Sequence, residues 1–426
     1  MATWSGFHRL DANERLRLVA SHARLTAQEA ALLQAPSALP HELAARFIEN
    51  AVGSFPLPLG FAVGFLVDGV ERVVPMAVEE SSVVAAASHG AKLARAGGGF
   101  TTTSMDPVTI AQVELRGLRD PAAAARRLRR RFAQWRHDLD EAIPSMVARG
   151  GGVRRIEARP VAGNRLVLHV HVDTRDAMGA NVANTVAERL GPVAAEAAGA
   201  RLGLRILSNL ATARVATASC RVPVEAVGGK EVARGIAEAD AFAHADAYRA
   251  ATHNKGVMNG IDPVALATGN DWRALEAGAH AYAARTGRYR ALTKWTVRAG
   301  ELHGRLELPV PVGTVGGVTR LHPVARACLK VLGDPDAVTL SRVMASVGLA
   351  QNLAALRALA TEGIQRGHMA LHAHNVALQA GLQGKDAEAV ARQMAAEGHV
   401  SGQRARALAL EFKKSARGDL APTRKA

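Results

Sequence analysis

The sequence predicts an α+β protein in which a small mixed domain is inserted into a larger, mainly helical one. Between residues 107 and 208, strand and helix patterns follow one another in the order β-α-β-β-α-β, which is the split motif of ferredoxin-like domains. The flanking segments 1–106 and 209–364 are rich in helical patterns, and so is the C-terminal stretch 365–426. We therefore expect a discontinuous large domain, an inserted small domain at 107–208 and a helical C-terminal unit.

The small domain is predicted from alternating apolar residues and glycine breaks. PVTIAQVELRG has the pattern of a strand, and a long basic helix is expected over 122–148, before a triple glycine. Two strands, VRRIEARPV and NRLVLHVHVD, are joined by a Gly-Asn turn, and a helix at 180–198 precedes the strand LGLRILS. In NRLVLHVHVD the apolar residues alternate with a set that includes His169 and His171, which is typical of a half-buried strand.

The larger domain begins with helical patterns over 8–50, followed by two strands over 59–80. A small-residue helix, SSVVAAASHGAKLARA, then ends at a triple glycine. Further helices are expected at 229–248, 272–286, 323–332 and 340–361.

Composition limits the class of protein. The 426 residues include 53 lysines and arginines against 38 aspartates and glutamates, a net charge of +15, and 48% are hydrophobic, which excludes a mostly disordered chain. Two cysteines, Cys220 and Cys328, exclude a disulfide framework and a four-cysteine zinc site. The N-terminal segment lacks the apolar run of a signal peptide, and the uncharged stretch 51–67 contains Pro56 and Pro58. We therefore expect a cytoplasmic protein that does not span a membrane.

Four local clusters could carry chemistry. Glu79 and Glu80 lie between an apolar strand and the small-residue helix, where they could serve the helix N-terminus or supply a general acid. The run from Tyr248 to Pro263 is polar and has little periodicity, so we expect a loop. In it, Lys255 could stabilise a developing oxyanion or simply be solvated.

The other two clusters lie further along the chain. TGNDWR places Asp271 where it could cap the following helix or tune a neighbouring ionisable group. His368 and His372 are four residues apart and share a helix face, but the pattern is not H-E-x-x-H and no third ligand is evident. We therefore expect no metal site, and a histidine near the C-terminal segment is the better candidate for a general acid.

The glycine-rich segments do not follow a standard nucleotide motif. No G-x-G-x-x-G follows a strand, and there is no P-loop sequence. DAMGAN at 176–181 nevertheless lies between a strand that ends at Asp173 and a helix that begins near Ala180. A strand, a small-residue turn and a helix N-terminus can together hold a pyrophosphate.

Taken in order, these motifs resemble class II, bacterial-type 3-hydroxy-3-methylglutaryl-CoA (HMG-CoA) reductases over nearly the whole chain. The resemblance implies two successive hydride transfers that interconvert HMG-CoA and mevalonate plus free CoA. The segments that carry it are ENAVG at 49–53, the Glu79-Glu80 pair, DAMGAN at 176–181, ATHNKGVMNGIDP at 251–263, GNDWRALEAGAHAY at 269–282, PVGTVGG at 311–317, GLAQNL at 348–353 and ATEGIQRGHMALH at 360–372.

The resemblance implies a catalytic set of Glu80, Lys255, Asp271 and His368. Lys255 would stabilise the hemithioacetal oxyanion, and His368 would protonate the departing CoA thiolate. Glu80 would deliver a proton during carbonyl reduction. Asp271 would tune the ammonium group of Lys255 and the carboxyl group of Glu80.

The resemblance also implies binding residues and an assembly. It implies a homodimer with the active site at the subunit interface, further assembly into a hexamer, and a mobile C-terminal flap at 365–426 that brings His368 over the site. The small, ferredoxin-like domain would bind the dinucleotide. Residues for the hydroxymethylglutaryl end would be Ser82, Arg249 and Asn259, with Gln351 and Asn352 close to them. Residues for the dinucleotide would be Asp176, Met178, Gly179, Ala180 and Asn181.

Three positions depart from the family pattern. Ser81 stands where proline is usual, His374 where arginine is common, and Ile143 where NADH-using relatives have an aspartate for the ribose. The rest of the sequence most resembles the degradative branch, so we expect NAD(H) and mevalonate catabolism. A biosynthetic enzyme that uses NADP(H) is the alternative.

Two other classes of protein remain as alternatives. A nucleic-acid-binding protein would explain the net charge and the run RRLRRR at 126–131. However, aromatic residues are only 4%, and the expected strands lack the aromatic side chains on which bases stack. An inactive homologue that only binds acyl-CoA is the second alternative, against which the intact set of four catalytic residues argues. We expect neither a nucleic acid nor a membrane as partner.

Overall fold

The structure, a computed structural model, describes residues 4–35, 39–361 and 363–418; within these, the side chains of 364–371 and 413–418 are not described. Two compact units make up the chain, residues 1–354 and residues 355–426. The first contains both β-sheets and the second is helical.

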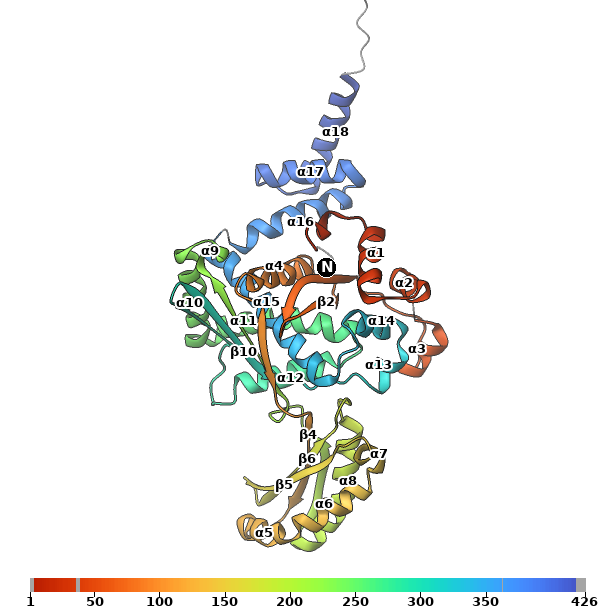
Figure 1. The fold of residues 1–426 in the computed structure, drawn as a ribbon, viewed down its shortest axis with the longest axis vertical. Coiled ribbons are helices and arrows are strands. Elements are labelled where there is room, and N and C mark those ends of the chain that lie inside the picture. The colour runs from red at the N-terminus through yellow and green to blue at the C-terminus, as the bar shows by residue number, and fades with distance from the viewer. Residues whose placement is uncertain (1–3, 36–38, 362, 419–426) are drawn as a thin grey trace, which may run out of the picture. The chain divides into compact units, whose positions relative to one another are not determined.

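A six-stranded sheet supports the larger part of the first unit (Figure 1). Its strands are β1 (Leu59–Val67), β2 (Val70–Ala77), β3 (Phe100–Ser104), β8 (Val215–Pro223), β9 (Thr293–Arg298) and β10 (Glu301–Pro309). They lie in the order β2-β1-β3-β8-β10-β9. β1 and β2 form the hairpin that the sequence predicts, with its turn at Asp68 and Gly69.

The sequence did not predict β3, β8, β9 and β10, so the large domain holds more strand than expected. β8 is built largely of small residues, whose strand propensity is weak. β10 contains Gly304, where a Cβ would overlap the ring of Trp295. A glycine inside a strand weakens the strand pattern, but here it lets an aromatic ring pack against the backbone.

The second sheet belongs to the inserted segment. Its strands are β4 (Val108–Arg116), β5 (Gly152–Val161), β6 (Arg165–Asp173) and β7 (Arg201–Leu207). They lie in the order β5-β6-β4-β7, and every neighbouring pair is antiparallel. The element order β-α-β-β-α-β is therefore the one that the sequence predicts.

Helices cover one face of this sheet (Figure 1): α5 (Pro121–Leu128), α6 (Phe132–Glu141), α7 (Pro144–Val147) and α8 (Ala180–Ala198). The prediction of one continuous helix over 122–148 is wrong. A 3-10 turn (Arg129–Arg131) separates α5 from α6, and Ile143 takes a non-helical conformation directly before Pro144. The proline ring disfavours helical geometry in the residue before it, which explains the second break.

The first unit's other helices surround the six-stranded sheet. They are α1 (Ala12–Ala23), α2 (Ala27–Gln34), α3 (His41–Phe47), α4 (Val83–Arg95), α9 (Val224–Val227), α10 (Lys230–Ala245), α11 (Ala247–Ala267), α12 (Trp272–Ala283), α13 (Gly317–Leu321), α14 (Pro323–Val331) and α15 (Ala337–Ala360). Capping boxes at Asp11 and Thr26 start α1 and α2.

The helix α15 is the only one among the described residues that is long and apolar enough to span a bilayer. Of its apolar window, 72% is buried inside the protein.

The expectation of a loop at 248–263 is wrong, because α11 runs through it for 21 residues. Its polar residues are compatible with a helix because each buried one finds a partner. His253 Nε2 lies 2.6 Å from Thr293 Oγ1, and the amide of Asn254 donates to the carbonyl of Arg290 across 2.9 Å. Buried hydrogen bonds thus replace the apolar face that a helix normally shows in its sequence.

The second unit contains three further helices, α16 (Ile364–Gln379), α17 (Gly384–Glu397) and α18 (Gly402–Gly418). A small core holds them together, formed by residues that include Ala377, Val390, Met394 and Leu408. The helical character expected for the C-terminal stretch is therefore present.

Candidate active site

The candidate site centres on an ion pair between two distant motifs. Lys255, on α11, donates a hydrogen bond from Nζ to Oε2 of Glu80 across 2.8 Å. Glu80 follows β2 directly, just before α4. The side chains are 60% and 39% exposed, so a substrate can reach both charges.

The turn after Glu80 does not cap α4 with a side chain. Ser82 is the N-cap residue, but its hydroxyl makes no capping hydrogen bond and the first turn holds no acidic residue. The capping interpretation of Glu79 and Glu80 is therefore wrong. Ser82 instead has a left-handed backbone, with φ of 71°, which is uncommon for a residue other than glycine. Residues held in this conformation cluster at functional sites, although they also occur in turns and helix caps.

One face of α11 presents Lys255 and Asn259, two of the polar residues expected to act on the substrate. Lys255 and Asn259 are four residues apart, so they lie on the same face of the helix. Arg249, six residues before Lys255, lies nearer the side of the helix that carries His253; it is half-buried, and this burial lowers the pKa of its guanidinium while the charge of Asp240 opposes the shift. The opposite face is anchored in the core through His253 and Asn254.

Two residues expected near the substrate lie instead in the core. The side-chain oxygen of Asn352 accepts a hydrogen bond from the Trp295 indole at 2.8 Å, and its nitrogen lies 3.2 Å from His253 Nε2. Asn352 therefore fixes α11 on its core-facing side, through His253. Gln351 is buried too, and its side-chain oxygen has no hydrogen-bond partner among the described residues.

Asp271 starts α12. Its carboxylate accepts hydrogen bonds from the backbone of Arg273 and Ala274 at 3.1 Å, which confirms the capping interpretation. Among the described residues, no hydrogen bond or ion pair joins Asp271 to Lys255 or Glu80.

The DAMGAN segment forms the start of α8. Gly179 has a φ of 95°, and a Cβ there would lie 2.5 Å from Thr174 Cγ2, so the position requires glycine. No side chain caps the 19-residue helix, and its first turn, which begins with Ala180 and the exposed Asn181, carries no acid. A helix N-terminus with free amides and no competing carboxylate suits a phosphate group.

A hydrogen-bonded bridge joins this segment to the Asp271 motif. The carbonyl of Asp176 accepts from Thr314 at 2.8 Å, and the amide of Gly313 donates to Asn270 Oδ1 at 2.8 Å. The Asp176 carboxylate accepts from the amide of Ala337 and is thus used inside the protein. The PVGTVGG segment therefore connects the two motifs physically.

Sequence reasoning missed one further anchor of this region. Arg214 is buried, and its guanidinium donates to the carbonyls of Met178 at 2.9 Å and Val312 at 2.8 Å. Burial lowers its pKa to about 10, still above neutral pH. Arginine is mostly exposed in proteins, so no sequence signal marks this residue as internal.

Comparison with known proteins fits these motifs. The family model for hydroxymethylglutaryl-coenzyme A reductase matches residues 11–373. The chain belongs to this family. It is 47% identical to the 3-hydroxy-3-methylglutaryl-coenzyme A reductase of Archaeoglobus fulgidus over 93% of this chain and 91% of that protein. A protein of Borreliella burgdorferi, named a probable reductase of this kind, is 35% identical over 77% of each chain.

Solved structures agree. The fold is similar to that of the class II HMG-CoA reductase of Streptococcus pneumoniae bound to NADPH in open conformations, with a TM-score of 0.82 and 43% identity over 84% of this chain and all of that one. Another structure of the reductase from this organism covers 96% of this chain, with a TM-score of 0.83 and 41% identity. The protein is therefore an α+β oxidoreductase of the HMG-CoA reductase family.

Of two further positions in the family pattern, one has a side chain that is not described and the other is buried. His368 lies in α16, but its side chain is outside the described part of the chain. Ile143, which stands where the family resemblance leads us to expect an aspartate, is 6% exposed and packs in the core of the small sheet. Its side chain therefore cannot face a ribose.

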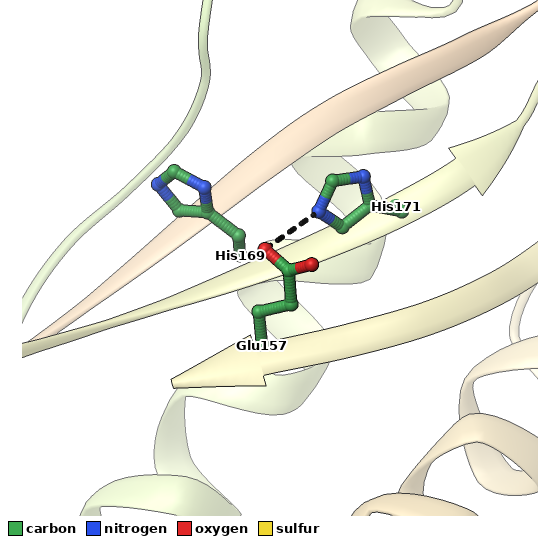
Figure 2. Close-up of side chains that lie close together, drawn as sticks. All are labelled: Glu157, His169 and His171. Atoms are coloured by element: carbon green, nitrogen blue, oxygen red, sulfur yellow. Dashed lines mark ion pairs between the residues drawn. The ribbon is translucent and has the colours of Figure 1, made fainter. Parts of the chain in front are cut away.

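A group of possible metal ligands lies on the small sheet, away from these motifs. Glu157, His169 and His171 place their ligand atoms within 4.8 Å of one another. Figure 2 shows the ring of His169 directed away from the other two side chains. Arg159 lies 3.0 Å from His169 Nε2 and Arg155 lies 3.1 Å from Glu157, so a cation would have to displace two guanidinium groups. We assign no metal to this group.

Proposed function

We propose that this reductase interconverts HMG-CoA and mevalonate plus CoA with NAD(H), and that it serves mevalonate catabolism in the cytoplasm. The observation that carries the catalytic part is the Lys255–Glu80 pair, at 2.8 Å and open to solvent. An ammonium and a carboxylate held together in this way can stabilise an oxyanion and exchange a proton with it.

In the proposed mechanism, the nicotinamide supplies or accepts hydride. Lys255 binds the thioester oxygen of the substrate and stabilises the negative charge that develops on it. Glu80 transfers a proton to the carbonyl oxygen of the aldehyde formed after CoA leaves. His368 protonates the CoA thiolate as it departs, and Asp271 acts on Lys255 and Glu80 through its charge.

Binding is assigned to the surrounding residues. Ser82, Arg249 and Asn259 hold the hydroxymethylglutaryl group, and Gln351 and Asn352 support them from the core. Met178, Gly179, Ala180 and Asn181 form the seat of the dinucleotide at the start of α8, while Asp176 fixes that seat to α15.

NAD(H) is favoured by the pairing of arginines on the small sheet. Arg154 forms an ion pair with Asp173, and Arg155 forms one with Glu157, so each already has a carboxylate partner that a 2′-phosphate would have to replace or share. NADP(H) is the second candidate. Arg149 is exposed and makes no ion pair among the described residues, and the pneumococcal relative was solved with NADPH.

The family resemblance adds an assembly and domain division to the proposal. The large domain comprises 1–106 and 209–364, the small domain 107–208 and the flap 365–426. Two copies form a dimer with the site at their interface, and dimers associate into a hexamer. CoA, carrying several phosphates, is the polyanion that part of the +15 charge attracts.

The test of cofactor and direction is a comparison of kcat/KM for NADH and NADPH with HMG-CoA, and for NAD⁺ and NADP⁺ with mevalonate and CoA. A higher kcat/KM with NAD(H), together with efficient mevalonate oxidation, supports the proposal. A preference for NADPH would overturn the cofactor assignment. If Arg149→Ala then abolished that preference, Arg149 would be identified as the residue that binds the 2′-phosphate.

A further inference from the structure

A buried arginine joins the turn that starts α8 to the segment that follows β10. Arg214 lies directly before β8, and only 5% of it is exposed. One nitrogen of its guanidinium, Nη1, lies 2.9 Å from the carbonyl oxygen of Met178 and 3.3 Å from that of Ala177. The other, Nη2, lies 2.8 Å from the carbonyl oxygen of Val312. A single guanidinium thus holds together two segments that are far apart in the sequence.

The turn 176–178 is bound from inside the protein at each of its carbonyl groups. The carbonyl of Asp176 accepts a hydrogen bond from the backbone amide of Thr314 at 2.8 Å. The other two carbonyls each accept from Arg214 and from a threonine hydroxyl at 2.9 Å, in the pairs Ala177 with Thr174 and Met178 with Thr109. Because the negative ends of these peptide groups are used inside the protein, the uncapped amides at the start of α8 are left for an anion.

Arg214 also places a positive charge behind this helix N-terminus. Burial lowers the pKa of its guanidinium to about 10, with the charges of Asp173 and Asp176 opposing the shift, so the group stays charged at neutral pH. No ion pair joins it to a carboxylate in the part of the chain that the structure describes. Asp173 is paired with Arg154, and the carboxylate of Asp176 accepts from the amide of Ala337. A buried cation that is bound only by carbonyl groups is costly, and an anion at the start of α8 reduces that cost.

The segment that Arg214 binds leads to the start of α12. Val312 is followed by Gly313, whose amide donates to Asn270 Oδ1 at 2.8 Å, and Asn270 lies directly before the residue that caps α12. A Cβ on Gly313 would lie 2.5 Å from the backbone nitrogen of Met178, so the two segments approach each other closely here. Continuous contacts therefore connect the turn 176–178, through Arg214 and Gly313, with the start of α12.

We propose that Arg214 is a positioning residue for the dinucleotide. Its guanidinium fixes the turn 176–178 relative to the start of α12, so that a dinucleotide bound at α8 is held in one place relative to Asp271. Its charge strengthens the attraction of the α8 N-terminus for the pyrophosphate. Arg214 acts from behind the turn, because its hydrogen bonds go to backbone carbonyls. This inference rests on the proposed binding of the dinucleotide at the start of α8.

The test measures binding and needs no turnover. Full-length protein is titrated with NADH and with NADPH, followed by nicotinamide fluorescence, and ADP-ribose and AMP are added as competitors. ADP-ribose contains the pyrophosphate, whereas AMP has a single phosphate. Arg214→Met removes the charge and both hydrogen-bonding arms, and Arg214→Lys keeps the charge without the fork. Arg72→Met is the matched control, because Arg72 is also partly buried and donates to a backbone carbonyl, that of Leu332 at 2.6 Å.

Arg214→Met should raise the Kd of the better-bound cofactor and the Kd of ADP-ribose in parallel, by about tenfold, which corresponds to the loss of one hydrogen bond to a charged group. The Kd of AMP should rise by about twofold or less, since AMP spans only part of the seat. Arg214→Lys should fall between Arg214→Met and the unaltered protein. Arg72→Met should lower the thermal midpoint and leave every Kd unchanged.

An unchanged Kd of ADP-ribose in Arg214→Met would overturn the proposal. An equal rise in Arg72→Met, or a rise for AMP as large as that for ADP-ribose, would also overturn it, because either result indicates a general loss of structure. If thermal unfolding shows that Arg214→Met does not fold, Arg214→Lys decides alone: the Kd of ADP-ribose should rise by about threefold, and no rise is equally contradictory.

Gly179→Ala separates failure of this inference from failure of the proposed cofactor seat, because its added Cβ obstructs the seat directly. If Gly179→Ala weakens binding of the cofactor and of ADP-ribose while Arg214→Met does not, only the role of Arg214 is overturned. If Gly179→Ala also leaves both Kd values unchanged, or if the unaltered protein binds neither NADH nor NADPH, the proposed seat at α8 is overturned as well.

Discussion

Lys255 and Glu80, 175 residues apart in the sequence, meet in a hydrogen bond of 2.8 Å at the junction of β2, α4 and α11. Both side chains are more than one-third exposed, and an ion pair in that environment adds little to stability. We propose that its contribution is instead to chemistry, where a fixed ammonium and a reachable carboxylate are needed together.

Lys255→Ala should reduce the rate of HMG-CoA-dependent oxidation of reduced nicotinamide by roughly 10²–10³-fold, the usual loss when an oxyanion donor is removed. The thermal midpoint should change little, because the pair is exposed. Lys294→Ala, an exposed lysine on β9, is the control and should retain activity. Near-normal activity of Lys255→Ala would refute the oxyanion role.

Ser82 allows its backbone and hydroxyl roles to be separated. Ser82→Gly should raise the free energy of unfolding by about 0.5–1 kcal/mol, because glycine adopts a φ of 71° without strain. Ser82→Ala keeps the strain and removes the hydroxyl, so it should raise KM for HMG-CoA without stabilising the protein. Chemical denaturation and steady-state kinetics measure the two effects; an unchanged KM in both variants would exclude a substrate contact.

Gly179→Ala should raise KM for the nicotinamide cofactor and lower the thermal midpoint, since the added Cβ meets Thr174 and the backbone is left-handed. Gly199→Ala, at the other end of α8, is the matched control. Its backbone is also left-handed, with a φ of 62°, but nothing lies near the added Cβ. It should cost stability alone, about 1 kcal/mol. An equal effect of both variants on cofactor KM would contradict a special role for Gly179.

Acid should destabilise the four-stranded sheet through His169. Burial, with the charges of Arg159 and His171, lowers the pKa of His169 from 6.5 to about 4. The unfolded chain therefore takes up a proton below pH 6.5 that the folded state refuses until about pH 4, so the unfolding free energy falls across this window as pH falls.

His169→Gln should make that fall shallower, by at most about 3 kcal/mol between pH 6.5 and pH 4. The measurement is urea unfolding as a function of pH, with the exposed His137→Gln as control. An unchanged pH dependence in His169→Gln would show that the folded protein accepts the proton.

Strands and helices with a regular apolar period were predictable, and elements held by specific polar contacts were not. The β1–β2 hairpin and the small-sheet strand NRLVLHVHVD follow alternation and glycine turns directly, but the expectation of a half-buried strand is wrong, because His169 and His171 are buried as well. α11 was missed because Asn254 and His253 are buried through hydrogen bonds to Arg290 and Thr293, and those partners lie about 40 residues away.

The site shows the same division. The residue types of Glu80 and Lys255 suggested chemistry, but only the fold shows that they touch. Asn352 looked like a substrate residue because it lies in a family motif, whereas its amide is occupied by Trp295 and His253. Arg214 gave no signal, because nothing in a sequence marks a guanidinium that is buried by backbone carbonyls.

The stoichiometry of the reaction tests the central claim most directly. Purified protein should oxidise two equivalents of reduced nicotinamide for each mevalonate formed from HMG-CoA. Lys255→Ala should form both mevalonate and oxidised cofactor far more slowly than the unaltered protein. Absence of cofactor oxidation with both NADH and NADPH, or mevalonate formation that is independent of Lys255, would contradict the account.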